Sequence, residues 1–337
     1  MKLVTFEDSQ RAHRVGALVD DGTRIVDLAS ACTARGWEVD ADRSFRSVQA
    51  MIEGGEQTLA QAYDLVRAPA AGTTVPVAGT VLHAPLQPPP QMRDCLCFEG
   101  HLVQAFRNLR TMRAQQSSDP AAKMAEMERD GVLAVPKTFY EQPIYYKANR
   151  FAVTGTGHDV VWPSYSELMD FELEFGIYIG KKATNVRADA ARPYIYGYTI
   201  FNDMTARDAQ MAEMGGQLGP AKGKDFDTSN PMGPCLVTAD EMPDPYGLTM
   251  TARINGEEWS RGNSGTMFWN FESVIAHISR DETLYPGEFL GSGTVESGCG
   301  IELMRFLKPN DVVELEVEGI GILRNRLVRP DRAAHAE

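Results

Sequence analysis

The sequence has few cysteines and no long apolar run. Its five cysteines stand at positions 32, 95, 97, 235 and 299. An odd, scattered set in a chain of 337 residues argues against a disulfide framework and favours reduced thiols. No apolar stretch approaches the roughly 18 residues of a membrane-spanning helix. The amino end reaches Glu7 and Asp8 before the core of a signal peptide could form, so we expect a cytoplasmic protein.

Basic residues are also scarce. The 33 Lys and Arg residues are outnumbered by 46 Asp and Glu residues, which gives a formal net charge of −13. Nucleic-acid binding and docking on an anionic membrane surface both need clustered positive charge, so both are disfavoured. With 43% hydrophobic and 23% charged residues, the composition is that of a globular protein. We therefore expect a small-molecule partner, no nucleic acid and no membrane.

Two familiar motifs are absent. Cys95 and Cys97 come shortly before His101, but no second cysteine pair or His-x3-5-His follows, so a zinc site there is not favoured. The loop 219–234 is dense in glycine and proline and contains Lys224. It lacks the Gly-x4-Gly-Lys-Ser/Thr spacing of a phosphate loop, and a plain surface connector remains the alternative interpretation.

Proline and hydrophobic periodicity divide the chain. Two alternating runs flank Asp20-Asp21-Gly22, which predicts a hairpin, and residues 44–68 have helical spacing. Residues 84–91 contain four prolines and indicate a linker. Length alone favours roughly two domains. We therefore predict a small N-terminal β-rich domain at 1–85 and a larger domain at 86–337.

The larger domain begins with polar, helix-like sequence and continues with strands. Residues 102–130 lack a continuous apolar stripe, so we expect them on the surface, with 102–135 as a candidate lid. Strand patterns follow at 171–179, 248–254 and 312–317, the second ending in an Asn255-Gly256 turn. The whole predicts a β-rich α+β fold.

One predicted strand has two carboxylates on the same face. Glu172 and Glu174 alternate with apolar residues, and two adjacent carboxylates repel each other unless a cation lies between them. Mg²⁺ and Ca²⁺ prefer such oxygens. A half-exposed strand with a solvated acidic face is the alternative.

A second acidic segment follows at 201–210. Asn202 or Asp203 is a plausible helix cap, and in a helix Asp203, Arg207 and Gln210 would share one stripe. These side chains would present an acid, a cation and an amide together. A cap followed by an ordinary i,i+4 ion pair is the alternative.

Together these motifs resemble the fumarylacetoacetate hydrolase family. The order is Asp94-x6-His101, then Glu-x-Glu, Asp-x3-Arg-x2-Gln, Gly-Lys-x-Phe and a Gly-Thr followed by Glu302. The resemblance runs from about residue 90 to 330, and more weakly over the first 85 residues. It implies a mixed β-roll catalytic domain with a small N-terminal β domain, assembled as a homodimer.

The resemblance also implies roles for individual residues. It makes Mg²⁺, or Ca²⁺ or Mn²⁺, the cofactor, with His101 as the base that activates water and Glu302 orienting it. Arg207, Gln210 and Lys224 would bind developing negative charge, and Tyr146 and Thr294 would contact substrate. The implied metal ligands are Asp94, Glu172, Glu174 and Asp203.

The implied reaction is hydrolytic cleavage of a carbon–carbon bond in an acylpyruvate or fumarylacetoacetate-like β-diketo acid, as in the breakdown of aromatic compounds. Leu96 and Met214 replace two tyrosines of fumarylacetoacetate hydrolase, which favours a more apolar substrate pocket. Smaller relatives use a His-x2-Glu pair, but here that position is Gln104, which favours hydrolysis over decarboxylation. Isomerisation, hydration or decarboxylation of a 2-oxo acid remains the enzymatic alternative, and ligand binding without turnover the non-enzymatic one.

Overall fold

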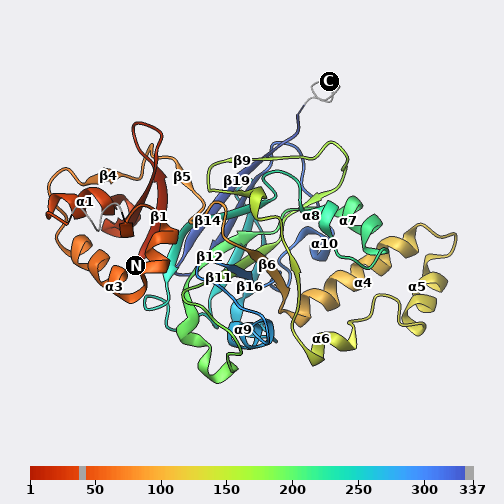
Figure 1. Ribbon diagram of the computed structural model, residues 1–337. Coiled ribbons are helices and arrows are strands. Elements are labelled where there is room, and N and C mark those ends of the chain that lie inside the picture. The colour runs from red at the N-terminus through yellow and green to blue at the C-terminus, as the bar shows by residue number, and fades with distance from the viewer. Residues whose placement is uncertain (38–42, 331–337) are drawn as a thin grey trace.

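The computed structural model describes residues 1–37 and 43–330 and contains one large mixed sheet (Figure 1). In the described residues this sheet has 12 strands, with the order β4-β3-β2-β1-β14-β12-β11-β17-β6-β7, while β5 pairs with β1 and β8 with β14. Its strands are β1 (Lys2–Glu7), β2 (His13–Val19), β3 (Arg24–Asp27), β4 (Thr74–Pro76), β5 (Leu82–His83), β6 (Met92–Leu96), β7 (Ile144–Lys147), β8 (Val153–Thr154), β11 (Leu173–Ile179), β12 (Ile195–Asn202), β14 (Asn230–Thr238) and β17 (Phe289–Gly291).

A second sheet of five strands has the order β16-β15-β18-β19-β9, and β10 pairs with β13. These strands are β9 (Asp159–Val161), β10 (Met169–Asp170), β13 (Thr205–Ala206), β15 (Thr249–Ile254), β16 (Glu257–Asn263), β18 (Val312–Val317) and β19 (Gly321–Val328). The expected turn after β15 is present, because Asn255 (φ 53°) and Gly256 (φ 82°) both have the positive φ of a type I′ hairpin.

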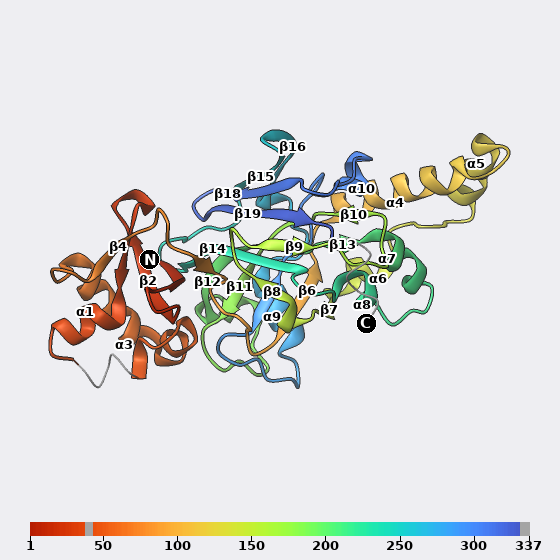
Figure 2. The same cartoon turned by 90° about the horizontal axis from the view of Figure 1, so that it is seen from above.

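Helices cover the sheets and extend from one end (Figures 1 and 2). They are α1 (Leu28–Ala34), α3 (Val48–Arg67), α4 (Glu99–Gln115), α5 (Pro120–Arg129), α6 (Lys137–Glu141), α7 (Arg207–Met214), α8 (Ala221–Lys224), α9 (Phe271–Ile278) and α10 (Gly300–Leu303). Short 3₁₀ turns lie at Asp20–Gly22, Arg150–Ala152, Ala188–Ala190, Arg192–Tyr194 and Ser264–Thr266. Among the helices so described, none is both long enough and apolar enough to cross a bilayer.

The N-terminal segment contains the predicted hairpin and helix. β2 and β3 are antiparallel around the turn at residues 20–22, and α3 begins after Ser47, whose side chain accepts a hydrogen bond from the amide of Ala50. β1, however, also pairs with β14, through Lys2 with Val237 and Leu3 with Leu236. The N-terminal strands therefore continue the large sheet, and the division at residue 85 stays a prediction.

The core lies on both faces of the central strands. Every residue of β11 is buried, so the strand has no solvated face. On one face the rings of Phe175 and Phe271 of α9 meet edge to face, with centroids 5.0 Å apart, and on the other Tyr178 packs on Phe289 at 5.3 Å. These strand-rich layers, with few helices, confirm the β-rich α+β fold expected from the sequence.

The polar segment 102–130 forms two helices, as predicted. α4 and α5 are separated at residues 116–119, where Asp119 caps α5 by accepting from the amide of Ala122. Both views show this pair extending from the end of the molecule opposite α1 and α3 (Figures 1 and 2). Met127 is the buried residue of α5, so this helix is mostly surface. Closure over the site remains a prediction.

Candidate metal and catalytic site

Three of the predicted metal ligands lie together in the interior. Asp94 lies in the middle of β6, Glu174 lies on β11, and Asp203 follows β12 directly. One oxygen from each lies within 4.8 Å of the others, and all three side chains are buried. The cluster forms because β12, β11, β17 and β6 are consecutive neighbours in the large sheet. We call Asp94, Glu174 and Asp203 the carboxylate cluster.

The residues of the carboxylate cluster suit a hard divalent cation. Among the described residues, Glu174 Oε2 and Asp203 Oδ1 are buried oxygens without a hydrogen-bond partner. Burial, together with the charge of Glu172, raises the pKa of Asp94 to about 6, and burial with the charges of Asp94 and Glu172 raises that of Asp203 to about 7. Burial and the charges of Asp94 and Asp203 raise the pKa of Glu174 well above its ordinary value. A bound cation would satisfy the free oxygens and remove this repulsion.

Neighbouring donors hold the cluster in place. The Tyr146 hydroxyl donates to Asp203 Oδ2 at 2.8 Å, and the Thr294 hydroxyl donates to Glu174 Oε1 at 3.2 Å. The Gly293 amide donates to Asp94 Oδ1 at 3.2 Å. Gly293 has φ +73°, and a Cβ there would lie 2.1 Å from the Cys95 carbonyl oxygen, so only glycine fits. Tyr146 and Thr294 thus orient the carboxylates, and their predicted contact with substrate remains a prediction.

The fourth predicted ligand, Glu172, differs from the other three. Its Oε1 accepts from Arg207 at 2.7 Å, and its Oε2 accepts from Lys224 Nζ at 2.5 Å. Lys224 also donates to Asp203 Oδ2 at 2.6 Å, so it bridges Glu172 to the carboxylate cluster. Burial disfavours the charged form of Glu172, but Lys224 and Arg207 outweigh it and hold its pKa below the usual range. A role for Glu172 as a ligand remains a prediction.

Asp170 is a site residue that the sequence reasoning did not single out. Its Oδ2 accepts from Arg207 Nε at 2.7 Å, while the backbone amides of Gly300 and Ile301 donate to its two oxygens at 2.6 and 3.0 Å. Gln210 accepts from Arg207 Nη1 at 3.0 Å. Asp170 therefore fixes the Arg207 guanidinium relative to α10. Its place two residues before Glu172 was the available signal.

His101 and Glu302 form a buried dyad. His101 lies in the first turn of α4, and its Nδ1 is 3.0 Å from Glu302 Oε2 on α10. The Ser297 amide donates to Glu302 Oε1 at 2.9 Å, and the Asn108 side chain donates to the Glu302 carbonyl at 2.7 Å. Burial lowers the pKa of His101, but the Glu302 carboxylate outweighs burial, and the pKa lies above its ordinary value. Nδ1 is thus the nitrogen that faces the carboxylate.

The dyad and the carboxylate cluster belong to one site. The backbone of Glu172 forms a β-bridge with Cys299, which comes three residues before Glu302. Asp170 adds the second connection, from Arg207 to the start of α10. A histidine, two cations and a set of carboxylates therefore share one buried region. Such a region can remove a proton beside a polarised carbonyl group.

One local expectation is wrong, and two alternative interpretations are excluded. The helix of the second segment begins at Arg207, not at residue 203, and neither Asn202 nor Asp203 caps it. Asn202 Oδ1 instead accepts from the Glu172 amide at 3.1 Å, because β12 continues to residue 202 and a second strand pairing, β13 with β10, occupies 205–206. A half-exposed strand with a solvated acidic face is excluded, because Glu172 and Glu174 are both buried. The loop 219–234 is not a plain surface connector, because Lys224 is buried.

The two residues assigned to an apolar substrate pocket lie further out. Leu96 is half-buried at the end of β6. Met214 is 52% exposed at the last residue of α7, roughly 10 Å along the helix axis from Arg207. Gln104, one turn after His101, donates to Glu296 at 2.8 Å and accepts from the Ser297 hydroxyl at 3.0 Å. Contact of Leu96 or Met214 with substrate remains a prediction.

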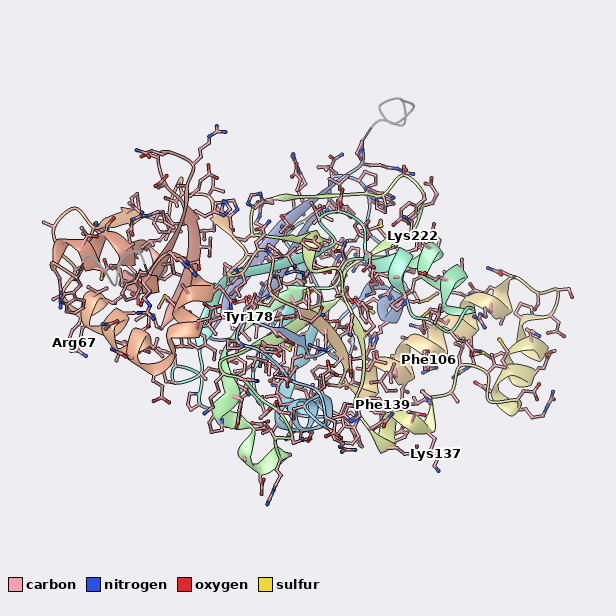
Figure 3. The ribbon with its side chains drawn as sticks, in the orientation of Figure 1. Arg67, Phe106, Lys137, Phe139, Tyr178 and Lys222 are labelled. Atoms are coloured by element: carbon pink, nitrogen blue, oxygen red, sulfur yellow. The ribbon has the colours of Figure 1, made fainter. Side chains whose placement is uncertain are left out.

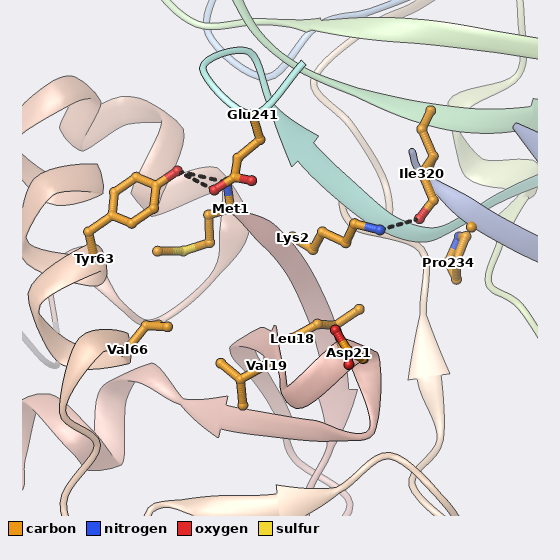
Figure 4. Close-up of a pocket in the computed structure, with 12 residues that line it drawn as sticks. Met1, Lys2, Leu18, Val19, Asp21, Tyr63, Val66, Pro234, Glu241 and Ile320 are labelled. Carbon is orange, nitrogen blue, oxygen red and sulfur yellow. Dashed lines mark hydrogen bonds and ion pairs between the residues drawn. The ribbon is translucent and has the colours of Figure 1, made fainter. Parts of the chain in front are cut away.

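A cavity of about 580 Å³ lies between the N-terminal segment and β14, away from this site, and several of its polar groups are paired (Figure 4). Tyr63 donates to Glu241 at 3.0 Å, and Lys2 donates to the Ile320 carbonyl at 3.4 Å. Side chains of the opposite end, such as Phe106 on α4 and Lys222 on α8, lie far from Arg67 at the end of α3 (Figure 3). None of the residues that line this cavity belongs to the carboxylate cluster or to the His101–Glu302 pair.

Comparisons with known proteins give a family and a set of relatives. Residues 103–328 match the family described as "Fumarylacetoacetate (FAA) hydrolase C-terminal". The protein named oxaloacetate tautomerase FAHD2A, mitochondrial, of Homo sapiens is 37% identical over 198 residues, which are 58% of this chain and 60% of the relative. The chain thus spans less than two thirds of that relative's length.

Solved structures support the same architecture. A putative HpcE protein from Mycobacterium smegmatis is 25% identical with a TM-score of 0.73, and the match covers 98% of this chain and 100% of that one. Fumarylacetoacetate hydrolase from Exiguobacterium antarcticum has a TM-score of 0.72 at 21% identity, with the same coverage. The second likeness concerns the fold alone.

Proposed function

Because the chain belongs to the fumarylacetoacetate hydrolase family, a family of enzymes, we propose that it is a metal-dependent hydrolase that cleaves a carbon–carbon bond in a β-diketo acid. The observation that carries the proposal is the buried His101–Glu302 dyad, connected through Glu172 and Asp170 to the carboxylate cluster. A site that only binds a ligand has no need of a positioned base.

The proposed cofactor is Mg²⁺, held by Asp94, Glu174 and Asp203. When bound, a divalent cation supplies Lewis-acid polarisation of carbonyl oxygens and positive charge beside developing oxyanions. Glu172 is the fourth proposed ligand, and to join the others it would exchange one of its contacts with Arg207 and Lys224. The free oxygens of Glu174 and Asp203 support this assignment.

The chain's own residues supply proton transfer and charge balance. His101 takes a proton from water, and Glu302 stabilises the imidazolium that forms and keeps Nδ1 oriented. Arg207 and Lys224 bring two positive charges into an acidic region, which lowers the repulsion of an anionic acid. Gln210 is held against Arg207 and can donate its amide to the same substrate oxygen. The substrate is therefore proposed to be a dicarbonyl carboxylate of the acylpyruvate class.

A second candidate is keto–enol tautomerisation of a 2-oxo acid. It is favoured by the relatives at 35–37% identity that are named oxaloacetate tautomerases. The same residues serve it, because His101 would then take a proton from the carbon next to the carbonyl and deliver it to the carbonyl oxygen, which forms the enol. The reverse transfer, from the enol oxygen to that carbon, would form the keto acid. Water is a reactant only in hydrolysis.

A spectrophotometric panel tests both candidates. Purified protein is mixed with acylpyruvates, fumarylacetoacetate and oxaloacetate, with added Mg²⁺ or with EDTA, and enol absorbance is followed. Metal-dependent loss of absorbance with two acids found by chromatography supports hydrolysis. Interconversion of enol and keto forms without new products supports the tautomerase. No metal-dependent change with any compound would overturn the proposal of a metal-dependent enzyme of this class.

The proposal also includes a homodimer in the cytoplasm and a substrate that arises from the breakdown of aromatic compounds. The homodimer is checked by light scattering on the eluting protein, where a mass of one chain, 37.1 kDa, would contradict it.

A further inference from the structure

A thiol lies in direct contact with the proposed catalytic dyad. Cys299 Sγ donates to Glu302 Oε2 at 3.2 Å and lies 4.0 Å from His101 Nδ1. Nδ1 and Oε2 are themselves 3.0 Å apart. The three atoms form a small triangle of one nitrogen, one sulfur and one oxygen. The proposed mechanism uses the histidine and the carboxylate but gives the thiol no part.

The dimensions of this triangle are close to one face of a zinc tetrahedron. Zinc binds sulfur at about 2.3 Å, histidine nitrogen at about 2.0–2.1 Å and carboxylate oxygen at about 2.0–2.2 Å. Tetrahedral angles then place neighbouring ligand atoms roughly 3.3–3.6 Å apart. The observed separations of 3.0, 3.2 and 4.0 Å lie within about 0.5 Å of these values. Small side-chain shifts would make the three atoms ligands.

Neighbouring backbone groups fix the positions of Cys299 and Glu302. Cys299 is fully buried, and its backbone forms the β-bridge to Glu172. Glu302 keeps its second oxygen on the Ser297 amide, so Oε2 remains directed at the thiol and the imidazole. The His101 side chain is 10% exposed, which leaves an approach from solvent. A fourth position would be open to water.

This triangle differs chemically from the carboxylate cluster. The cluster offers only carboxylate oxygens, which suit Mg²⁺, whereas thiolate and imidazole select softer cations such as Zn²⁺. Resting on the function proposed above, we propose that His101, Cys299 and Glu302 form a second metal site that takes Zn²⁺ and inhibits the enzyme by occupying its base.

Binding of Zn²⁺ to a neutral His101 displaces the protons of the thiol and of Nδ1. The thiol proton leaves to solvent, and the Nδ1 proton moves to Nε2 through a change of tautomer, so one proton is released per Zn²⁺. Glu302 coordinates as the carboxylate. Nδ1 then carries the metal and Glu302 no longer accepts its proton, so the dyad cannot act as a base.

Binding is tested with Co²⁺, an optical probe for zinc sites, in protein whose carboxylate cluster is saturated with Mg²⁺. A sulfur-to-cobalt charge-transfer band at one equivalent is expected in the unaltered protein and absent in Cys299→Ser. The control is Cys235→Ser, because Cys235 is also buried but donates to the Ile320 carbonyl. A band that persists in Cys299→Ser and disappears in Cys235→Ser would overturn the proposal.

X-ray absorption of the Zn²⁺-loaded, unaltered protein gives a result that needs no variant. One sulfur at about 2.3 Å together with nitrogen or oxygen neighbours is expected. A shell of oxygens alone would mean that zinc binds the carboxylate cluster, and would overturn the proposal even if Cys299→Ser failed to fold.

Inhibition is measured against each protein's own zinc-free activity. The Zn²⁺ concentration for half-inhibition should rise on the order of 100-fold in Cys299→Ser, since losing even an outer partner of a zinc site costs about 10–100-fold. Activity with no zinc inhibition would refute this inference and leave the proposed function standing. Absence of turnover together with a normal Co²⁺ band would refute the proposed function and leave the second metal site standing.

Discussion

His101 Nδ1 lies 3.0 Å from Glu302 Oε2, and this contact joins the first turn of α4 to α10, two segments that are far apart in the chain. The carboxylate gives the imidazole one defined tautomer and raises its pKa against the effect of burial. The position of the imidazole therefore depends on α4 and α10 staying together, which the Asn108 bonds to the backbone of α10 support.

Replacing the base should separate turnover from metal binding. His101→Asn is expected to lower kcat by about 10²–10⁴-fold, the usual contribution of a general base, while Mg²⁺ affinity measured by calorimetry stays unchanged. His277→Asn is the control, because His277 lies on α9 against Tyr145 and away from the dyad. Near-normal turnover in His101→Asn would disprove the role of His101.

Glu172 and Glu174 should respond to substitution in opposite ways. Glu174→Gln replaces a carboxyl group whose charged form Asp94 and Asp203 repel, so the metal-free protein should keep or gain stability but lose its stabilisation by Mg²⁺. Glu172→Gln leaves Arg207 and Lys224 short of a counter-charge and should lower the melting temperature. Thermal unfolding with Mg²⁺ or EDTA measures both, and equal shifts in the two variants would contradict the assignment.

The stability of the metal-free protein should depend on pH in a defined direction. Burial raises the pKa of Asp94 to about 6 and that of Asp203 to about 7, from 3.8 in each case. The folded state therefore binds more protons than the unfolded state between about pH 4 and about pH 7, and its stability falls as pH rises through that range.

Mg²⁺ should reverse that trend, because it needs the ionised carboxylates. The difference in melting temperature between Mg²⁺ and EDTA should be near zero at about pH 5 and reach its full value by about pH 8. Glu174→Gln serves as the control without a complete site. A difference that is constant over this range would show that the three carboxylates do not take up the ion together.

Arg207 should matter for folding as well as for substrate. It is the buried cation between Asp170 and Glu172, so Arg207→Met leaves Asp170 without a cation and Glu172 with Lys224 alone, and should cost about 3–5 kcal/mol of unfolding free energy. Arg187→Met is the control, since Arg187 is 81% exposed in its pair with Asp189, and little change is expected. Urea unfolding measures both, and equal effects would contradict the buried pairing.

Local patterns in the sequence predicted the hairpin of β2 and β3, the helices α3, α4 and α5, and the strands β11, β15 and β18. Apolar residues alternate with a period of two in β11, and the turns beside β2, β3 and β15 contain residues that favour a hairpin turn. Both patterns depend only on residues that are close together in the chain, so the sequence was sufficient to predict these elements. Alternation could not reveal that both faces of β11 are buried. That depends on α9 and on the N-terminal segment, which pack on the strand from distant parts of the chain.

The partners of each carboxylate could not be predicted in this way. Lys224 reaches Glu172 and Asp203 only because α8 lies against β13, and Asp170 meets Arg207 only because β10 pairs with β13. The same pairing moved the start of α7 to Arg207, since residues 205–206 were already used in a strand. Tertiary pairing thus overrode the local preference of Asn202 and Asp203 for a helix cap.

Because β1 pairs with β14, the N-terminal strands cover the edge of β14 and protect its backbone groups from pairing with another chain. β14 is nine residues long, and Leu3 and Lys2 saturate its backbone groups at Leu236 and Val237. If the chain were cut at residue 85, this stretch would become an open sheet edge next to the apolar surface that α1 and α3 now cover. Such an edge is a template for strand addition, so the shortened protein would aggregate rather than behave as a self-contained catalytic domain.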